Sequence, residues 1–107
     1  MSNYSWMSKD LYSKSIYISE YESAWKISCA KSLISEALQN QVIILGGDIL
    51  NLNLEYTDDN WYYEPNKAKD INYNSIKSCN CMENYLKKYI DLHGVDYYII
   101  IVCVTKL

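Results

Sequence analysis

The 107-residue sequence contains no arginine and no phenylalanine, and it has only one histidine and one proline. All ten of its cationic side chains are therefore lysines, and thirteen acidic residues give a formal net charge of −3 at pH 7. Without arginine the chain lacks the planar, bidentate group that best binds phosphate, and its net negative charge repels polyanions. These absences argue against direct binding to nucleic acid.

Long apolar segments are also missing. The longest apolar run, residues 97–104, has eight residues, whereas a membrane-spanning helix needs about 20. The N-terminal residues show neither the cationic start nor the apolar stretch of a secretory signal. We therefore expect a cytoplasmic protein without a membrane anchor, in which all four cysteines are reduced thiols (Cys29, Cys79, Cys81 and Cys103).

What the sequence does contain is apolar and aromatic surface. Half of its residues are apolar, 21% are charged, and there are twelve tyrosines and three tryptophans. This composition excludes an intrinsically disordered chain. Residues 1–107 suffice for one core and show no internal repeat or linker. A single domain is therefore predicted.

The first segment with helical periodicity is residues 27–40, where apolar side chains recur on one side. This pattern predicts a helix that begins near Ser28 and leaves Trp25 on an extended approach. Residues 19–22 resemble a capping box, which would start the helix earlier. We favour the later start because Trp25 lies off the apolar stripe.

A second helix is predicted from Asp70, a good N-cap residue, to Leu92. Gly94 follows just beyond its end, as is common after helices. The lone histidine, His93, lies in the last turn on the apolar side, where we expect a structural role.

The remaining segments predict strands. Residues 42–45 are a short apolar strand that stops at a turn or bulge over residues 46–48, and residues 50–56 alternate between apolar and polar side chains. Residues 57–60 have turn chemistry, and residues 61–64 return as the partner strand of a hairpin.

Residues 97–104 are apolar on both faces, which predicts a central strand with something covering each side. Either the two helices lie on opposite faces of the sheet, or another chain completes one face. Residues 1–23 are expected to form an irregular or edge-strand start. The fold class is therefore α+β, a small sandwich with a mostly antiparallel sheet of about four or five strands and two main helices.

No residue is predicted to be catalytic, and no metal or cofactor is predicted. Cys79, Cys81 and His93 could be drawn as a metal site, but zinc sites usually place two residues between paired cysteines, and here there is one. His93 has no orienting carboxylate and no nucleophile in a recognisable motif.

Acidic and aromatic residues are concentrated in residues 48–64, which include five carboxylates and no lysine. A general acid/base pair needs a cleft, whereas a hairpin is exposed and convex. A docking surface suits these residues better, because tyrosine and tryptophan are frequent anchors and negative charge speeds encounter with a basic partner. A solvated turn beside a hairpin anchored by its tryptophan explains the composition equally well.

We divide this cluster by expected role. The residues expected to contact a partner are Glu55, Tyr56, Asp58, Asp59, Tyr62, Tyr63 and Glu64. The residues expected to be structural are Gly46, Gly47, Asp48 and Trp61. Asp48 would accept hydrogen bonds from turn amides, and Trp61 would anchor the hairpin in the core.

Two segments of this region carry a family resemblance. The pairing of Gly46-Gly47-Asp48 with Asp59-Asn60-Trp61-Tyr62-Tyr63 resembles the signature of the immunity protein 40 family, and the likeness extends over residues 24–104. One departure is Asp58, where the family pattern has tyrosine before the aspartate.

The resemblance implies a bacterial antitoxin of a polymorphic-toxin or contact-dependent growth-inhibition system. Its partner would be a cognate toxin domain, a basic nuclease acting on tRNA or other nucleic acid, whose active site or substrate entry it blocks. Two alternatives come from other classes: a small enzyme that uses paired carboxylates, and a homo-oligomeric module, such as a homodimer, formed through an exposed face of the strand at 97–104.

Overall fold

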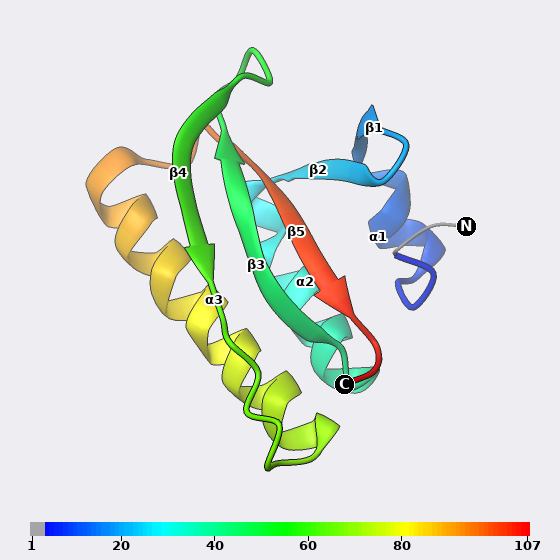
Figure 1. Ribbon diagram of the computed structural model, residues 1–107. Helices are drawn as coiled ribbons and strands as arrows, with labels where there is room; N and C mark the ends of the chain where they lie inside the picture. Colours follow the sequence, from blue (N-terminus) through cyan, green and yellow to red (C-terminus); the bar gives the residue numbers. More distant parts are fainter. Residues whose placement is uncertain (1–3) are drawn as a thin grey trace.

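The computed structural model describes residues 4–107 as one antiparallel sheet of five strands with helices packed against it (Figure 1). Its strands lie in the order β1-β2-β5-β3-β4. The elements are α1 (Lys9–Ser13), β1 (Ile16–Ser19), β2 (Glu22–Lys26), a 3-10 turn (Ile27–Cys29), α2 (Ala30–Gln39), β3 (Ile43–Leu50), β4 (Tyr56–Tyr62), α3 (Ile71–His93) and β5 (Tyr98–Val104). The predicted α+β class is confirmed.

Both main helices form where local signals predict them. The Asp70 side chain accepts a hydrogen bond from the Tyr73 amide and caps α3, and Gly94, with φ of 86°, ends it. A 3-10 turn leads into α2, so the start near Ser28 is confirmed, and the capping-box alternative at residues 19–22 is wrong. Those residues instead connect β1 to β2.

Trp25 explains why the chain approaches α2 in an extended form. It lies in β2, is fully buried, and its Nε1 donates to the Leu11 carbonyl oxygen at 2.9 Å. Leu11 belongs to α1, a five-residue helix that the sequence pattern did not predict. Contacts distant in sequence hold this helix, since the Glu36 carboxylate of α2 accepts hydrogen bonds from the amide and hydroxyl of Ser8.

The hairpin between β3 and β4 differs from the prediction of a strand at 50–56 and a turn at 57–60, and both predictions are wrong. The reversal lies at residues 51–55, and β4 already begins at Tyr56. Its cause is Asn51, whose side-chain oxygen accepts hydrogen bonds from the amides of Asn53 and Glu55. Such local bonding favours a turn over a strand ladder.

The Gly-Gly-Asp segment forms a bulge and does not end the strand. β3 continues through it, and the pairing of β3 with β5 shifts register between Ile44 and Gly46. Gly46 has φ of 153°, and a Cβ there would overlap the Trp61 carbonyl oxygen. Only glycine fits this position without strain.

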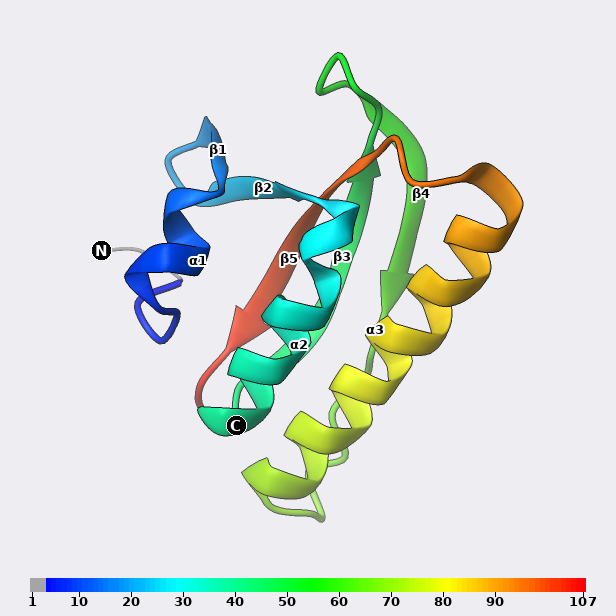
Figure 2. The same cartoon turned by 180° about the vertical axis from the view of Figure 1, so that it is seen from behind.

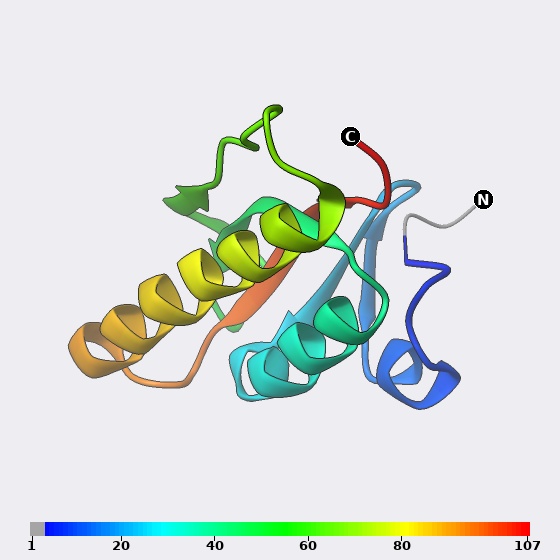
Figure 3. The ribbon, with the colours of Figure 1, turned by 90° about the horizontal axis from the view of Figure 1, so that it is seen from below.

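The two main helices cover the same face of the sheet (Figure 2, Figure 3). The core on that face includes Leu33 of α2, Met82 of α3, and Ile99 and Ile101 of β5. The alternative in which the two helices lie on opposite faces is therefore wrong. β2 and β3 lie on either side of β5 and run parallel to each other, and α2 connects them. β4 and β5 likewise lie on either side of β3 and run parallel, and α3 connects them in the opposite direction across the sheet. Right-handed crossovers therefore place both helices on one side of the sheet.

Within residues 4–107, no helix is long and apolar enough to span a membrane.

Candidate functional site

The side of the sheet turned away from α2 and α3 is the candidate site, which we call the open face. Strand register places three rows of side chains on it, because partners in adjacent strands project to the same side. Tyr56 connects these rows to the Glu22 carboxylate through its hydroxyl. On strands β2, β3, β4 and β5 the open face consists of Glu22, Ala24, Lys26, Asp48, Leu50, Tyr56, Asn60, Tyr62, Tyr98, Ile100 and Val102.

An apolar floor lies at the centre of the open face. Ala24, Leu50 and Ile100 are fully buried, although no helix covers this side of the sheet. Partly buried neighbours, including Leu54 and Tyr98, pack over them. The strand at 97–104 is thus central, as predicted, but side chains of the sheet and its loops cover its second side.

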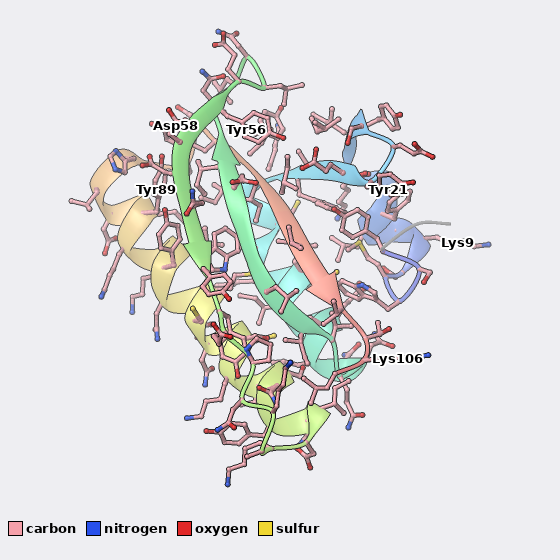
Figure 4. The ribbon with its side chains drawn as sticks, viewed as in Figure 1. Lys9, Tyr21, Tyr56, Asp58, Tyr89 and Lys106 are labelled. Atoms are coloured by element: carbon pink, nitrogen blue, oxygen red, sulfur yellow. The ribbon has the colours of Figure 1, made fainter. Side chains whose placement is uncertain are left out.

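Around this floor, large apolar surfaces remain exposed. Val102 is 49% exposed, Tyr56 is 51% exposed and Tyr62 is 68% exposed. In Figure 4, drawn from the side of the open face, Tyr56 lies over the upper part of the sheet, whereas Tyr89 comes from α3. Clusters of exposed aromatic groups are typical of protein-binding surfaces.

Carboxylates accept hydrogen bonds from the two exposed tyrosines of the open face. The Tyr62 hydroxyl donates to the Glu64 carboxylate at 3.0 Å, and the Tyr56 hydroxyl donates to that of Glu22 at 3.4 Å. The bond to Glu64 raises the pKa of Tyr62, and partial burial followed by the charge of Glu22 raises that of Tyr56. Both phenols therefore remain protonated at neutral pH.

Asp48 lies in the middle of β3, opposite Asn60 and Ile100, and not at a turn. Its expected role of binding turn amides is therefore wrong. Within the described part of the chain its half-buried carboxylate has no hydrogen bond. Burial, followed by the nearby negative charge of Glu22, raises its pKa above the ordinary 3.8.

Asp48→Asn is expected to stabilise the protein at pH 7. A carboxyl whose pKa is higher in the folded than in the unfolded state weakens folding once it ionises, so stability falls as the pH rises through the interval between the two values. Urea unfolding should give a higher midpoint for the variant at pH 7 and a smaller difference near pH 3.5. A variant less stable than the wild type at pH 7 would contradict this prediction.

The other expected contact residues lie elsewhere. Asp59 accepts a hydrogen bond from the Tyr89 hydroxyl of α3 at 2.8 Å, and the Tyr63 hydroxyl donates to Asn74 of α3 at 2.7 Å. Glu55 lies in the hairpin turn, and Asp58 lies on the edge strand with φ of 70°. The structure therefore places Tyr56 and Tyr62 at the two ends of β4 on the open face, with Glu64 bonded to Tyr62, and directs Asp59 and Tyr63 towards α3.

Gly47 and Trp61 pair on the helix-covered face of the sheet. Trp61 is 6% exposed, and its indole stacks on Tyr85 with ring centroids 5.4 Å apart. A Cβ on Gly47 would overlap both this indole and the Ile100 carbonyl oxygen. Gly47 thus provides the space in which Trp61 lies.

Most members of the open face are not among the site residues expected from the sequence. Glu22, Tyr98 and Val102 join it because β2 and β5 are neighbours of each other and β5 is the neighbour of β3. The alternation of residues 97–104 indicated that Tyr98 and Val102 share a side. No sequence signal indicated that Glu22 lies close to Tyr56.

The sites considered for chemistry are distant from the open face. Within residues 4–107 there is no group of three or more potential metal ligands, and the cysteines form no disulfide. The His93 ring packs on Tyr89 at 4.4 Å between centroids. A groove of about 480 Å³ between α2 and α3 is lined by none of the expected contact residues, and its charges of both signs include Lys31 and Glu83.

Comparison with known proteins gives a match to a protein family. A family model described as Immunity protein 40 matches residues 10–103, which is nearly the whole chain. No curated protein and no solved structure matches this chain. The matched range includes every residue of the open face, and it confirms the resemblance carried by the Gly-Gly-Asp and Asp-Asn-Trp-Tyr-Tyr segments.

Proposed function

The chain belongs to the immunity protein 40 family, and on this basis we propose that it binds and neutralises a cognate toxin domain that is a basic nuclease. Membership of the family implies an antitoxin role and a non-enzymatic inhibitor. The proposal adds the chemistry of the toxin and the way it is blocked. It places the inhibitor in the cytoplasm of a bacterium that carries a polymorphic-toxin or contact-dependent growth-inhibition system.

The observation that carries the proposal is an exposed surface that combines carboxylates with tyrosines. Glu64 and Glu22 hold the hydroxyls of Tyr62 and Tyr56, and the chain has a net charge of −3. A nuclease binds phosphate through a cationic cleft, and an anionic protein surface can occupy the same cleft. The inhibitor needs no arginine for this purpose, because the partner provides the cations.

Binding of this kind has two parts with different physical origins. Long-range attraction between opposite charges accelerates encounter and weakens as salt screens it. Aromatic side chains buried at the contact then slow dissociation, and such anchors commonly contribute most of the binding free energy. Neither part requires the inhibitor to perform a reaction.

The proposal is tested with the toxin domain encoded beside this chain. We expect cells that produce the toxin to survive only when this protein is produced with it. In vitro, one equivalent of inhibitor should abolish cleavage of tRNA or DNA by the purified toxin domain. The association rate constant should fall by about tenfold or more between low and physiological salt.

Two results would contradict the proposal. One is continued killing when the folded protein is abundant in the cell. The other is turnover of a substrate by this protein alone, which would favour the carboxylate-dependent enzyme. An association rate independent of salt would reject the basic character of the toxin surface while leaving the antitoxin role intact.

A further inference from the structure

We propose that the open face of the sheet is the surface on which the toxin docks, and that it receives a basic protein surface whose cationic side chains lie beside an apolar contact. This inference rests on the proposed function and adds the location of the interface. It moves the contact from the hairpin tip, where Glu55 lies, to the centre of the sheet.

The first argument is that no helix of residues 4–107 covers this side of the sheet. Helices α2 and α3 both lie on the opposite face (Figure 2, Figure 3). The open face nevertheless has a buried apolar floor and three strongly exposed apolar side chains, Tyr56, Tyr62 and Val102. Gly46 lies between Val102 and Tyr62 in the sheet and contributes no side chain, so both flanking groups are accessible to a partner.

The second argument is the distribution of charge. Of the ten lysines, only Lys26 lies in a strand, and it occupies the last position of β2. The open face carries Glu22 and Asp48, and Glu64 lies beside Tyr62. In the described residues the only ion pair joins Lys14 to Asp10 and includes none of these carboxylates. Their charge is therefore available to cations of a partner.

The third argument is that the polar groups of the face are already held in place. Tyr56 is hydrogen-bonded to Glu22 and Tyr62 to Glu64, so less side-chain freedom is lost on binding. Asp48 adds a charge in the middle of a strand without any hydrogen bond from the described residues. A residue that weakens folding in this way is commonly kept for function.

The charge also distinguishes a basic partner from a second copy of this chain. A two-fold symmetric dimer through the open face would bring the same patch of each subunit together. The acidic groups Glu22, Asp48 and Glu64 of one subunit would then lie in one interface with those of the other, and like charges across an interface are strongly unfavourable. A partner with lysine or arginine at the contact has the complementary sign.

The test uses a catalytically inactive form of the adjacent toxin domain and two matched pairs of variants. Glu22→Gln with Asp48→Asn removes two charges from the open face, and Glu83→Gln with Asp91→Asn removes two from α3. Tyr62→Ala removes an exposed tyrosine from the open face, and Tyr17→Ala removes one that is 74% exposed on β1. Circular dichroism and thermal unfolding establish that each variant is folded.

We expect the open-face variants alone to weaken binding. The Glu22/Asp48 pair should slow association about tenfold at low salt and flatten its salt dependence, since it removes charges that accelerate encounter. Tyr62→Ala should accelerate dissociation about tenfold or more, as loss of an interface anchor does. The α3 and β1 variants should bind within about twofold of the wild type.

Three outcomes would overturn the inference. Wild-type binding by the open-face variants, with weakened binding by the α3 pair, would move the interface to the helices and leave the proposed function standing. A wild-type dimer that loses its self-association in Tyr62→Ala but binds toxin unchanged would assign the open face to a second copy. Absence of any binding by the wild type would reject the proposed function together with this docking surface.

Discussion

Gly47→Ala is expected to lower the free energy of unfolding by about 3 kcal/mol, the upper range for overpacking a rigid core. The added Cβ would overlap the Trp61 indole and the Ile100 carbonyl oxygen. Neither neighbour can move easily, because Trp61 is stacked on Tyr85 and β3 is hydrogen-bonded to a strand on each side. Urea unfolding followed by tryptophan fluorescence measures the difference.

Gly94→Ala is the matched control. Gly94 also has a positive φ, 86°, but an added Cβ meets no atom within 4 Å. With φ of 86° and ψ of −168°, Gly94 has a conformation that favours glycine, and its substitution should lower the free energy of unfolding by about 1 kcal/mol, the lower end of the cost of such backbone strain. Equal effects at the two glycines would mean that Trp61 repacks without loss, and that Gly47 is not required for its position.

The glycines also show why part of the hairpin could not be predicted. A pair of glycines is compatible with a turn or with a bulge, and the choice depends on which strands lie alongside. Here β5 and β4 flank β3, and the close approach of Trp61 to Gly47 selects the bulge. Such contacts between distant segments leave no local pattern in the sequence.

The strand predicted at 50–56 illustrates a second limit. Leucines at 50, 52 and 54 alternate with polar residues, yet Leu50 is buried, Leu52 is 59% exposed and Leu54 has φ of 62°. The hydrogen bonds made by the Asn51 side chain decide in favour of a turn. By contrast, α3 was predictable over its full length because its cap residues, Asp70 and Gly94, are local signals.

The candidate site was likewise only partly predictable from the sequence. Tyr56, Tyr62 and Glu64 were predictable as exposed groups because they belong to a dense acidic and aromatic segment. Whether a side chain of β4 faces the open side or α3 depends on strand register, and for Asp59 the answer is α3. The contribution of Glu22 required the order of the strands, which composition and periodicity do not contain.

Asn74→Asp is expected to destabilise the protein by about 3 kcal/mol at pH 7, although the two side chains have almost the same shape. Asn74 is fully buried in α3. Its Nδ2 donates to the carbonyl oxygens of Asn66 and Asp70 at 3.0 and 2.9 Å, and its Oδ1 accepts from the Tyr63 hydroxyl at 2.7 Å. Aspartate would replace the donor with a negative oxygen that faces those carbonyl groups.

The pH dependence separates this cause from a general loss of packing. Burial beside carbonyl oxygens would raise the pKa of the new carboxyl, and its protonated form could again donate one hydrogen bond. The destabilisation should therefore shrink as the pH falls from 7 towards 4, with urea unfolding as the measurement. Asn84→Asp, at an exposed position of the same helix, makes the same change of charge and should alter stability by less than about 0.5 kcal/mol. If both variants behaved alike, the link from Asn74 to Tyr63 and Asn66 would not be what holds the end of β4 against α3.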